Sequence, residues 1–512
     1  MSDLGGYQPP PPAPPGAPPE KKTDDIPLWV VLVAGVVTLG LAGLLGFVVL
    51  TRGGDDHHES APASNHAAHH HYPKHWDHRI APYARIAARQ RGLTFKHPVP
   101  VRFLSPAAFT MSLEAEDQEP TQQDRREIEQ ATALLRAFGL LSGHVDLLRA
   151  VKGFNGAAVD AYYSFRTRSI TVRGRTITPA VKATLVHELT HVLQDQYFHV
   201  GARLKALQKK SGNGTSSAAG EVLDALVEGD AERMEGAYRS SLPPAQQHAL
   251  DAAQKAEGDR ATSTLAKIPK IVVTMQTSPY TLGIGLARTA AEQGGNAEVN
   301  RLLRHPPVHE TALMEPLRAL SRRRGATHVD VPSLEAGEKK FDSGEFGALS
   351  WYLMLAARIP VMDALEAADG WGGDAYVGFD RGDETCARIA YAGRTAADST
   401  RMTGALQQWI ADFPGARARV AQAGSRVSFE SCDPGTSAQL GNDDSADAVA
   451  LVSTRALVEV SLLHGGATAA QATCLGDRLV QSYTVAQLTD PTFGANDPTV
   501  TAHVQELAAR CR

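Results

Sequence analysis

The chain of 512 residues has little excess charge of either sign and few cysteines. Its 51 lysines and arginines are outnumbered by 56 aspartates and glutamates, and the formal net charge of −5 argues against a nucleic-acid-binding surface. Hydrophobic residues make up 43% of the chain, which is enough for a sizeable core. At roughly 100 to 200 residues per domain, the length indicates more than one folded unit.

The four cysteines, Cys386, Cys432, Cys474 and Cys511, all lie late in the chain. An even number of cysteines beyond an apolar segment is typical of disulfides formed in an oxidising compartment. Pairing neighbours along the chain predicts Cys386 with Cys432 and Cys474 with Cys511, one of three connectivities. Four reduced, buried cysteines in a cytosolic domain are the alternative.

Charge is absent between Asp25 and Arg52, and the run 28–50 is dominated by Val, Leu, Gly and Ala. It is long enough to cross a hydrocarbon core of about 30 Å, so residues 26–51 are predicted to form one uncleaved transmembrane anchor. Lys21 and Lys22 before the run favour a cytoplasmic N-terminus and an extracytoplasmic main domain. Residues 1–25 form a proline-rich, extended tail.

A histidine-rich linker, residues 52–79, follows the predicted anchor. Its eight histidines can bind divalent metal weakly, but a flexible polar spacer that holds the domain away from the membrane is the favoured explanation.

One stretch, residues 185–196, has a pattern that already describes a reaction. His187 and His191 stand four residues apart, so on a helix both imidazoles leave the same face and can share one metal ion, with Glu188 beside them. Thr178 and Pro179 indicate the start of this helix, and apolar residues at helical spacing predict its burial. The pattern predicts a zinc site with Glu188 as the general base and acid.

A catalytic zinc ion needs a third protein ligand and an open position. Gln194 and Tyr197 stand where a metzincin has glycine and histidine, which excludes that class. Residues 219–239 predict a helix, and Glu228 is the favoured third ligand because Gly229 and Ala231 would let this helix approach the first closely. The alternative is a solvated acidic face, since acids recur there at helical spacing: Glu221, Asp224, Glu228, Glu232 and Glu235.

Two further roles follow from the chemistry of such a site. Metal-bound histidines usually donate their second ring N–H to a carboxylate or carbonyl, and Asp230 and Glu232 are placed to accept it, Glu232 being the better candidate. The oxyanion formed in peptide hydrolysis needs a hydrogen-bond donor. His309, Tyr280 and Tyr376 are candidates, and the sequence does not choose between them.

Several strings together resemble a known family. They are His187 to Phe198, Glu228 to Ala231, Gly-Glu-Phe-Gly at 344–347 and Gly-Trp-Gly-Gly-Asp at 370–374. These are similar to a poorly characterised family of bacterial extracytoplasmic zinc metallopeptidases of the glutamate-zincin type, over roughly residues 80–413. The resemblance implies a zincin-like domain with His187, His191 and Glu228 as ligands and Glu188 as the catalytic residue. A basic residue commonly follows the last string in that family, whereas this chain has Ala375.

The expected fold is α+β and mostly helical, with a zincin-like metallopeptidase domain at 80–415 and a small C-terminal module at 416–512. Strands are predicted at 99–104, 158–165 and 169–172, and an edge among them could bind an extended substrate. Helices are predicted at 80–91, 122–141, 344–357, 469–488 and 499–510. A tight turn at 370–374 leads into a strand at 376–379, a strand is expected at 426–430, and 448–463 is strand or helix.

Two functions remain open at this point. The first is a membrane-anchored zinc peptidase that acts on a protein or peptide substrate. The second is a catalytically inactive zinc-binding scaffold, or an envelope binding protein, on a peptidase fold. The intact Glu188 favours the first, because a site without turnover has no need of a base there.

Overall fold

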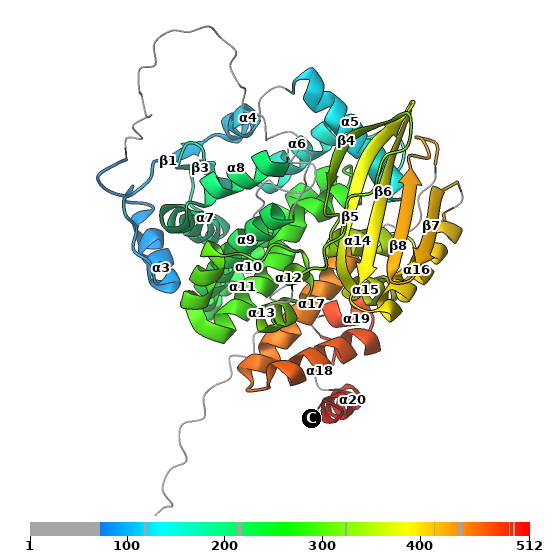
Figure 1. Cartoon of the computed structure of the whole chain (residues 1–512). Helices are drawn as coiled ribbons and strands as arrows, with labels where there is room; N and C mark the ends of the chain where they lie inside the picture. Colours follow the sequence, from blue (N-terminus) through cyan, green and yellow to red (C-terminus); the bar gives the residue numbers. More distant parts are fainter. Residues whose placement is uncertain are drawn as a thin grey trace, which may run out of the picture.

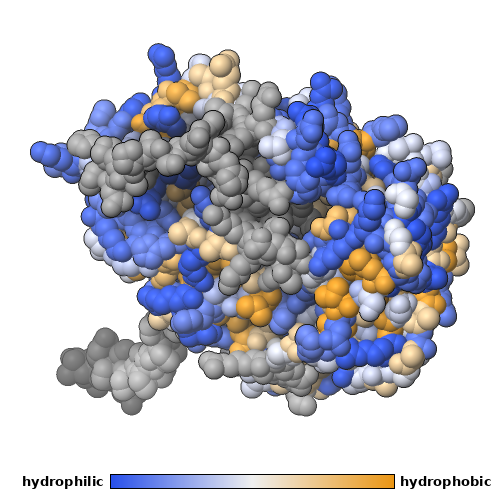
Figure 2. All heavy atoms as spheres, turned by 45° about the horizontal axis from the view of Figure 1, so that its top comes forward, coloured by the Kyte–Doolittle hydropathy of each residue, from blue (hydrophilic) through white to orange (hydrophobic). Residues whose placement is uncertain are grey.

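A computed structural model describes residues 72–116, 120–211, 218–322, 325–413, 415–438, 444–490, 492–494 and 497–511. The proline-rich tail, the predicted membrane anchor and most of the histidine-rich linker lie outside the described residues. Among the residues that are described, no helix has the length and apolar character needed to cross a bilayer. The face drawn in Figure 2 is mostly hydrophilic, with apolar residues in scattered groups.

The fold is α+β and mostly helical, as predicted, with two separate sheets (Figure 1). The helices that precede the larger sheet are α3 (Ala81–Arg91), α4 (Pro106–Glu116), α5 (Gln122–Ala137), α6 (Leu147–Ala158), α7 (Pro179–Phe198), α8 (Val200–Ser211), α9 (Ala219–Ser240), α10 (Pro244–Leu265), α11 (Lys270–Arg304), α12 (Thr311–Met314) and α13 (Pro316–Arg322). Those within and after it are α14 (Ala348–Ala356), α15 (Val361–Asp369), α16 (Ala396–Ala411), α17 (Ser445–His464), α18 (Ala469–Ser482), α19 (Val485–Thr489) and α20 (Pro498–Ala509).

The smaller sheet has three strands in the order β1-β3-β2. Its central strand β3 (Ser169–Arg173) pairs in parallel with β1 (Val101–Leu104) and antiparallel with β2 (Ala161–Ser164). The predicted pairing of the two strands before the metal helix is therefore confirmed. Strand β2 is an edge of this sheet and lies against α7.

The larger sheet is antiparallel throughout, in the order β4-β5-β6-β8-β7. Its strands are β4 (Glu338–Gly344), β5 (Trp371–Arg381), β6 (Glu384–Gly393), β7 (Arg417–Ala423) and β8 (Arg426–Cys432). Helices α14 and α16 bury their indole rings, Trp351 and Trp409, against Phe429 of β8. The domain boundary expected at 415 thus falls inside this sheet, and α17 beyond it packs against α11.

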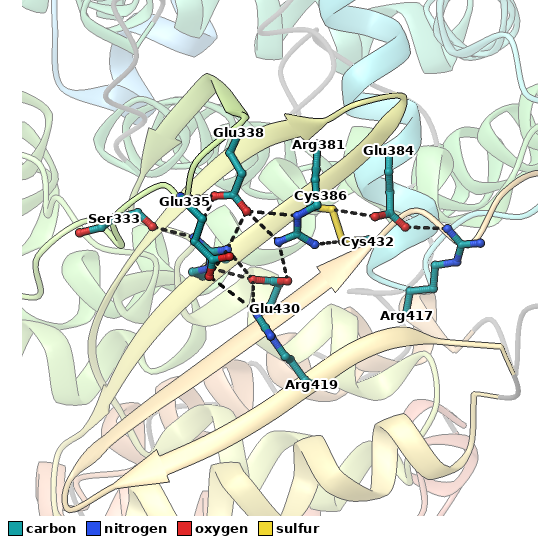
Figure 3. A network of polar contacts seen from close by, with 11 residues as sticks. Ser333, Glu335, Glu338, Arg381, Glu384, Cys386, Arg417, Arg419, Glu430 and Cys432 are labelled. Carbon is teal, nitrogen blue, oxygen red and sulfur yellow. Dashed lines mark hydrogen bonds and ion pairs between the residues drawn. A yellow bond between two sulfur atoms is a disulfide. The ribbon is translucent and has the colours of Figure 1, made fainter.

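A network of ion pairs links the strands of this sheet (Figure 3). Arg388 of β6 pairs with Glu338 of β4 at 3.0 Å and with Glu430 of β8 at 2.7 Å. Arg381 contacts the same two carboxylates, at 2.7 and 3.1 Å. Arg381 is the last residue of β5, and Gly382, at a φ of 63°, forms the turn to β6 together with Asp383.

The predicted disulfides, Cys386–Cys432 and Cys474–Cys511, are both confirmed. The first joins the paired strands β6 and β8, where the two cysteines lie directly opposite each other. The second joins Cys474 of α18 to Cys511, which lies two residues after the end of α20. One covalent link therefore lies within the larger sheet, and the other lies within the C-terminal helical segment.

Four local predictions were wrong, and glycine explains three of them. The turn expected at 370–374 is part of strand β5, where the backbone of Thr327 approaches Gly372 and Gly373 so closely that no side chain would fit at Gly373. The helix expected at 344–357 begins only at Ala348, because Gly347 has a φ of 90°. The helix expected at 122–141 ends at Ala137, two residues before Gly139 at a φ of 71°. The fourth, a single helix at 469–488, is interrupted by the extended backbone of Tyr483, which separates α18 from α19.

Candidate metal centre

Helix α7 carries the metal pattern through the interior of the protein. Thr178 caps its N-terminus by accepting a hydrogen bond from the Val181 N–H at 3.1 Å, and Pro179 occupies the first turn. The helix ends at His199, which adopts the left-handed conformation. Its residues are almost all buried, including both histidines and Glu188. Such burial removes competing water from the polar groups that α7 carries.

Three predicted side chains converge between α7 and α9. The Nε2 atoms of His187 and His191 each lie 3.2 Å from the same oxygen, Oε2 of Glu228. All three residues are at least 94% buried, and their ligand atoms lie within 4.8 Å of one another. Two ligands held at about 2.0 to 2.1 Å from a tetrahedral zinc ion lie about 3.3 Å apart. The spacing and the nitrogen and oxygen donors therefore fit zinc.

Burial and the neighbouring charges shift the pKa values of these three side chains. Burial favours the neutral form of His191, but the Glu228 carboxylate outweighs burial and raises the His191 pKa to about 10. Burial likewise opposes ionisation of Glu228, yet the histidines, His191 first, lower its pKa to about 2. The pKa of His187 is lowered, chiefly by burial. A divalent cation would replace the imidazolium proton and compensate the same buried carboxylate.

The side chain of Glu188 extends from α7 to the edge strand β2. Its Oε2 accepts a hydrogen bond from the backbone N–H of Tyr163 in β2 at 2.6 Å. Burial raises the pKa of Glu188 to about 8, while the nearby His191 acts in the opposite direction. A buried carboxylate whose pKa is near neutrality is suited to taking up and returning a proton.

The two predicted supporting acids lie in different surroundings. Oε1 of Glu232 lies 3.6 Å from Nδ1 of His187. Oε2 of Glu235 lies 3.7 Å from the same nitrogen, although Glu235 was not predicted for this role. Asp230 instead acts through Gln194. The His191 Nδ1 atom lies 2.9 Å from Oε1 of Gln194, whose Nε2 donates to Asp230 at 3.0 Å.

Only one of the three candidate oxyanion donors lies next to the two histidines. The Tyr280 ring stacks on His187 with 6.2 Å between ring centroids, and burial together with the acids around it, Glu228 first, raises its pKa. His309 is 2.8 Å from Glu345, and Tyr376 donates to Asp342 of β4. Tyr280 alone of the three adjoins the histidines.

The acidic stripe of α9 is not a solvated surface. Asp224, Glu228, Glu232 and Glu235 are all buried, which overturns that alternative. Contrary to the sequence-based prediction, Gly229 does not bring α9 close to α7, because it faces Gly283 of α11. A side chain at Gly229 would come within 2.0 Å of the Gly283 backbone. Helix α9 is thus packed between α7 and α11.

Two other groups of metal-binding residue types occur among the described residues. Glu384, Cys386 and Cys432 form one, but both sulfurs are consumed by the disulfide and are not thiolates. His187, Glu232 and Glu235 form the other, which shares His187 with the first site. The trio of His187, His191 and Glu228 is therefore the best candidate.

Sequence reasoning missed the residues that support the ligands from a distance. Arg91, in α3, donates to Asp230 at 2.7 Å across 139 residues of chain. Gln194 was considered only as a position that excludes a metzincin. A signal was available, because a glutamine three residues after a ligand histidine lies on the same face of the helix.

Comparison with known proteins gives one match. Residues 335–472 match the model of a family described as a domain of unknown function (DUF8575). No curated protein and no solved structure matches the chain. The matched segment begins just before β4, contains the larger sheet and reaches α18, whereas the residues of the candidate metal centre precede it. The resemblance to zinc metallopeptidases stays a prediction.

Proposed function

We propose that this protein is a zinc-dependent peptidase. The observation that carries the proposal is the convergence of His187, His191 and Glu228 on one point, with Glu188 buried beside them. When bound, zinc supplies Lewis acidity that lowers the pKa of water to about 7 and polarises a peptide carbonyl. Three protein ligands leave one position of a tetrahedral ion open for this chemistry.

Glu188 is the proton carrier in this proposal. It takes a proton from the attacking water and passes it to the departing amine. The Tyr163 N–H fixes one carboxylate oxygen at 2.6 Å, so the side chain is oriented before substrate binds. A cation in the site would lower the pKa of Glu188 from its raised value, and this favours the carboxylate needed for the first step.

Tyr280 and strand β2 are the proposed substrate contacts. The Tyr280 hydroxyl would donate to the oxyanion, which is supported by the stacking of its ring on His187. Strand β2 is the edge of its sheet, and its Tyr163 N–H points to Glu188 rather than to β3. An extended peptide lying along this edge would pass the catalytic carboxylate. The substrate class is therefore a protein or peptide.

We place the folded part outside the cytoplasm. Two disulfides support an oxidising compartment. The apolar run at 28–50, with two lysines before it, supports a single membrane anchor and a cytoplasmic N-terminus.

The test compares the native protein with Glu188→Gln and Glu228→Ala. Zinc per chain is measured first, and cleavage of a mixed peptide library is then followed by mass spectrometry. We expect one zinc ion per chain in the native protein and in Glu188→Gln, with cleavage reduced by about 10² to 10⁴ in that variant. Glu228→Ala should lose the metal.

Each result has a separate meaning. Equal cleavage by the native protein and Glu188→Gln would remove the proposed base. Stoichiometric zinc without cleavage by the native protein would favour a zinc-binding scaffold. Unchanged zinc in Glu228→Ala would place the third ligand elsewhere.

A further inference from the structure

The buried array Arg91–Asp230–Gln194 extends from α3 to the second ligand histidine. We infer that it is a positioning device that fixes the ring of His191 with Nδ1 protonated and Nε2 turned to the metal. The inference deepens the proposed function and rests on it. It assigns roles in the metal centre to Gln194 and to Arg91, which lies almost 100 residues before His187 in the chain.

The contacts in the array form an unbroken chain. His191 Nδ1 lies 2.9 Å from Gln194 Oε1, and Gln194 Nε2 lies 2.9 Å from the Val227 carbonyl oxygen and 3.0 Å from Asp230 Oδ2. Arg91 Nε donates to the same Asp230 oxygen at 2.7 Å. Arg91, Gln194 and Asp230 are each fully buried. Water therefore does not compete with these hydrogen bonds.

The chemistry of the acceptors fixes the direction of every hydrogen bond. The Val227 carbonyl and the Asp230 carboxylate can only accept, so the amide NH₂ of Gln194 must face them. The amide oxygen then faces His191, and an oxygen can only accept from Nδ1–H. In the neutral imidazole this leaves the lone pair on Nε2, the atom that lies 3.2 Å from Glu228.

Asp230 anchors the array because two arginines neutralise it. Arg91 Nε lies 2.7 Å from its Oδ2 atom and Arg233 Nη2 lies 2.8 Å from its Oδ1 atom, so each carboxylate oxygen is paired with a guanidinium group. Among the described residues, the Nη1 and Nη2 atoms of Arg91 have no hydrogen-bond partner. Leaving buried donors unsatisfied costs about 1 to 3 kcal/mol each. An apolar side chain would fill the position of Arg91 without this cost. We therefore assign to Arg91 the role of holding Asp230 through its Nε hydrogen bond.

The two ligand histidines are supported differently. His187 Nδ1 has carboxylates at 3.6 and 3.7 Å and no hydrogen bond, whereas His191 Nδ1 meets a neutral amide at hydrogen-bond distance. An amide fixes the orientation of a ring without adding charge next to it. The array therefore acts on the geometry of His191, and its loss should be visible in metal affinity.

The experiment uses the full chain with Gln194→Met, which keeps the side-chain volume and removes all three hydrogen bonds of the amide, to His191, Val227 and Asp230. Gln196→Met is the matched control, because Gln196 is buried on the same helix but bonds only to residues 96 and 97. The dissociation constant for zinc is measured by competition with a chelator. We expect Gln194→Met to bind zinc about 10 to 100 times more weakly and Gln196→Met to match the native protein.

A second measurement needs no variant. In the zinc-loaded native protein labelled with ¹⁵N-histidine, His191 should show a slowly exchanging proton on Nδ1. A proton on Nε2 of His191 would overturn the inference even if Gln194→Met failed to fold. In folded Gln194→Met this proton should exchange rapidly.

Failure of the inference differs from failure of the proposed function. Native zinc affinity and slow Nδ1 exchange in Gln194→Met would overturn the positioning role and leave the zinc site intact. A native protein that binds no zinc, or a Glu228→Ala variant that binds it normally, would overturn the site and the inference together.

Discussion

Glutamates at the metal centre and glutamates on the larger sheet have opposite partners. On the sheet, Glu338 and Glu430 are paired with arginines, which lower the pKa of each against the effect of burial (Figure 3). In α9, Glu228 faces two imidazoles, and burial and then Glu232 raise the pKa of Glu235. Glu338 and Glu430 of the sheet have their countercharges within the fold, whereas Glu228 and Glu235 of α9 are suited to an added cation.

The family match also separates the two regions, because it includes the larger sheet but not the metal centre. The matched family segment, residues 335–472, contains the charged network of the sheet and ends where α18 begins. The candidate centre lies before it, on α7 and α9. The regions nevertheless share one hydrophobic core, which runs from α9 through α11 to α14, α17 and β8. Substitutions outside the metal centre therefore measure how far zinc binding depends on the rest of the protein.

The largest effect should come from the crossing of α9 and α11. A side chain at Gly283 would lie 1.8 Å from the carbonyl oxygen of Ala225, one turn before Glu228. Backbone atoms cannot move aside as a side chain does, so Gly283→Ala should lower the free energy of unfolding by at least about 4 kcal/mol. Denaturant unfolding measures this, and zinc affinity should fall as α9 is displaced.

Gly404→Ala is the matched control for this substitution. Gly404 lies inside α16, and no atom lies within 4 Å of the side chain that would be added. Alanine there should raise stability by about 0.5 to 1 kcal/mol and leave zinc affinity unchanged. Equal changes in the free energy of unfolding for the two substitutions would show that the close contact at Gly283 does not determine the packing of α9 on α11.

The metal helix was predictable because its information is local. Histidines four residues apart, a threonine cap and a following proline specify helix, face and ligand atoms within about 20 residues of sequence. The position of Glu228 beside the two histidines was also predicted, although Gly229, which supported the prediction, faces α11 instead of α7. The pairing of cysteines was found because each bonds to its neighbour along the chain.

The rest depends on contacts between distant segments. Arg91 reaches Asp230 across 139 residues, and nothing in the local sequence of either indicates the other. The glycines at 372 and 373 favour a turn in the sequence, but each lies in β5 close to a distant backbone. Thr327 approaches Gly373, and residues 392–394 approach Gly372. Gly229 was assigned to the wrong neighbour for the same reason, because periodicity shows that a face is buried but not against which helix.

A smaller effect is expected from the disulfide of the sheet. Replacing Cys386 and Cys432 together by alanine removes a link between β6 and β8 that closes a loop of 46 residues. The free energy of unfolding should fall by about 3 kcal/mol, measured from denaturant curves followed by tryptophan fluorescence. Zinc affinity should not change, because the disulfide lies in the other region. A parallel loss of zinc would show that the centre depends on the sheet.

The smallest effect is expected at Glu459 of α17, which lies within the matched segment 335–472. Like Glu235 of α9, it has a pKa raised by burial. Burial raises its pKa to about 7, with Arg455 opposing the shift and Asp477 adding to it. The folded state then holds a proton that the unfolded chain releases near pH 4.5. Stability should therefore fall as the pH rises from 4.5 to 7 and change little from this group above that range.

Glu459→Gln tests this by removing the titration. Each pKa unit corresponds to about 1.4 kcal/mol, so native stability should drop by about 2 to 3 kcal/mol more than that of the variant between these pH values. Glu129→Gln, at an exposed position of α5, should follow the native curve. If Glu459→Gln also followed the native curve, then Arg455 would hold Glu459 ionised throughout. Glu459 would then belong with the arginine-paired acids of the sheet rather than with those of α9.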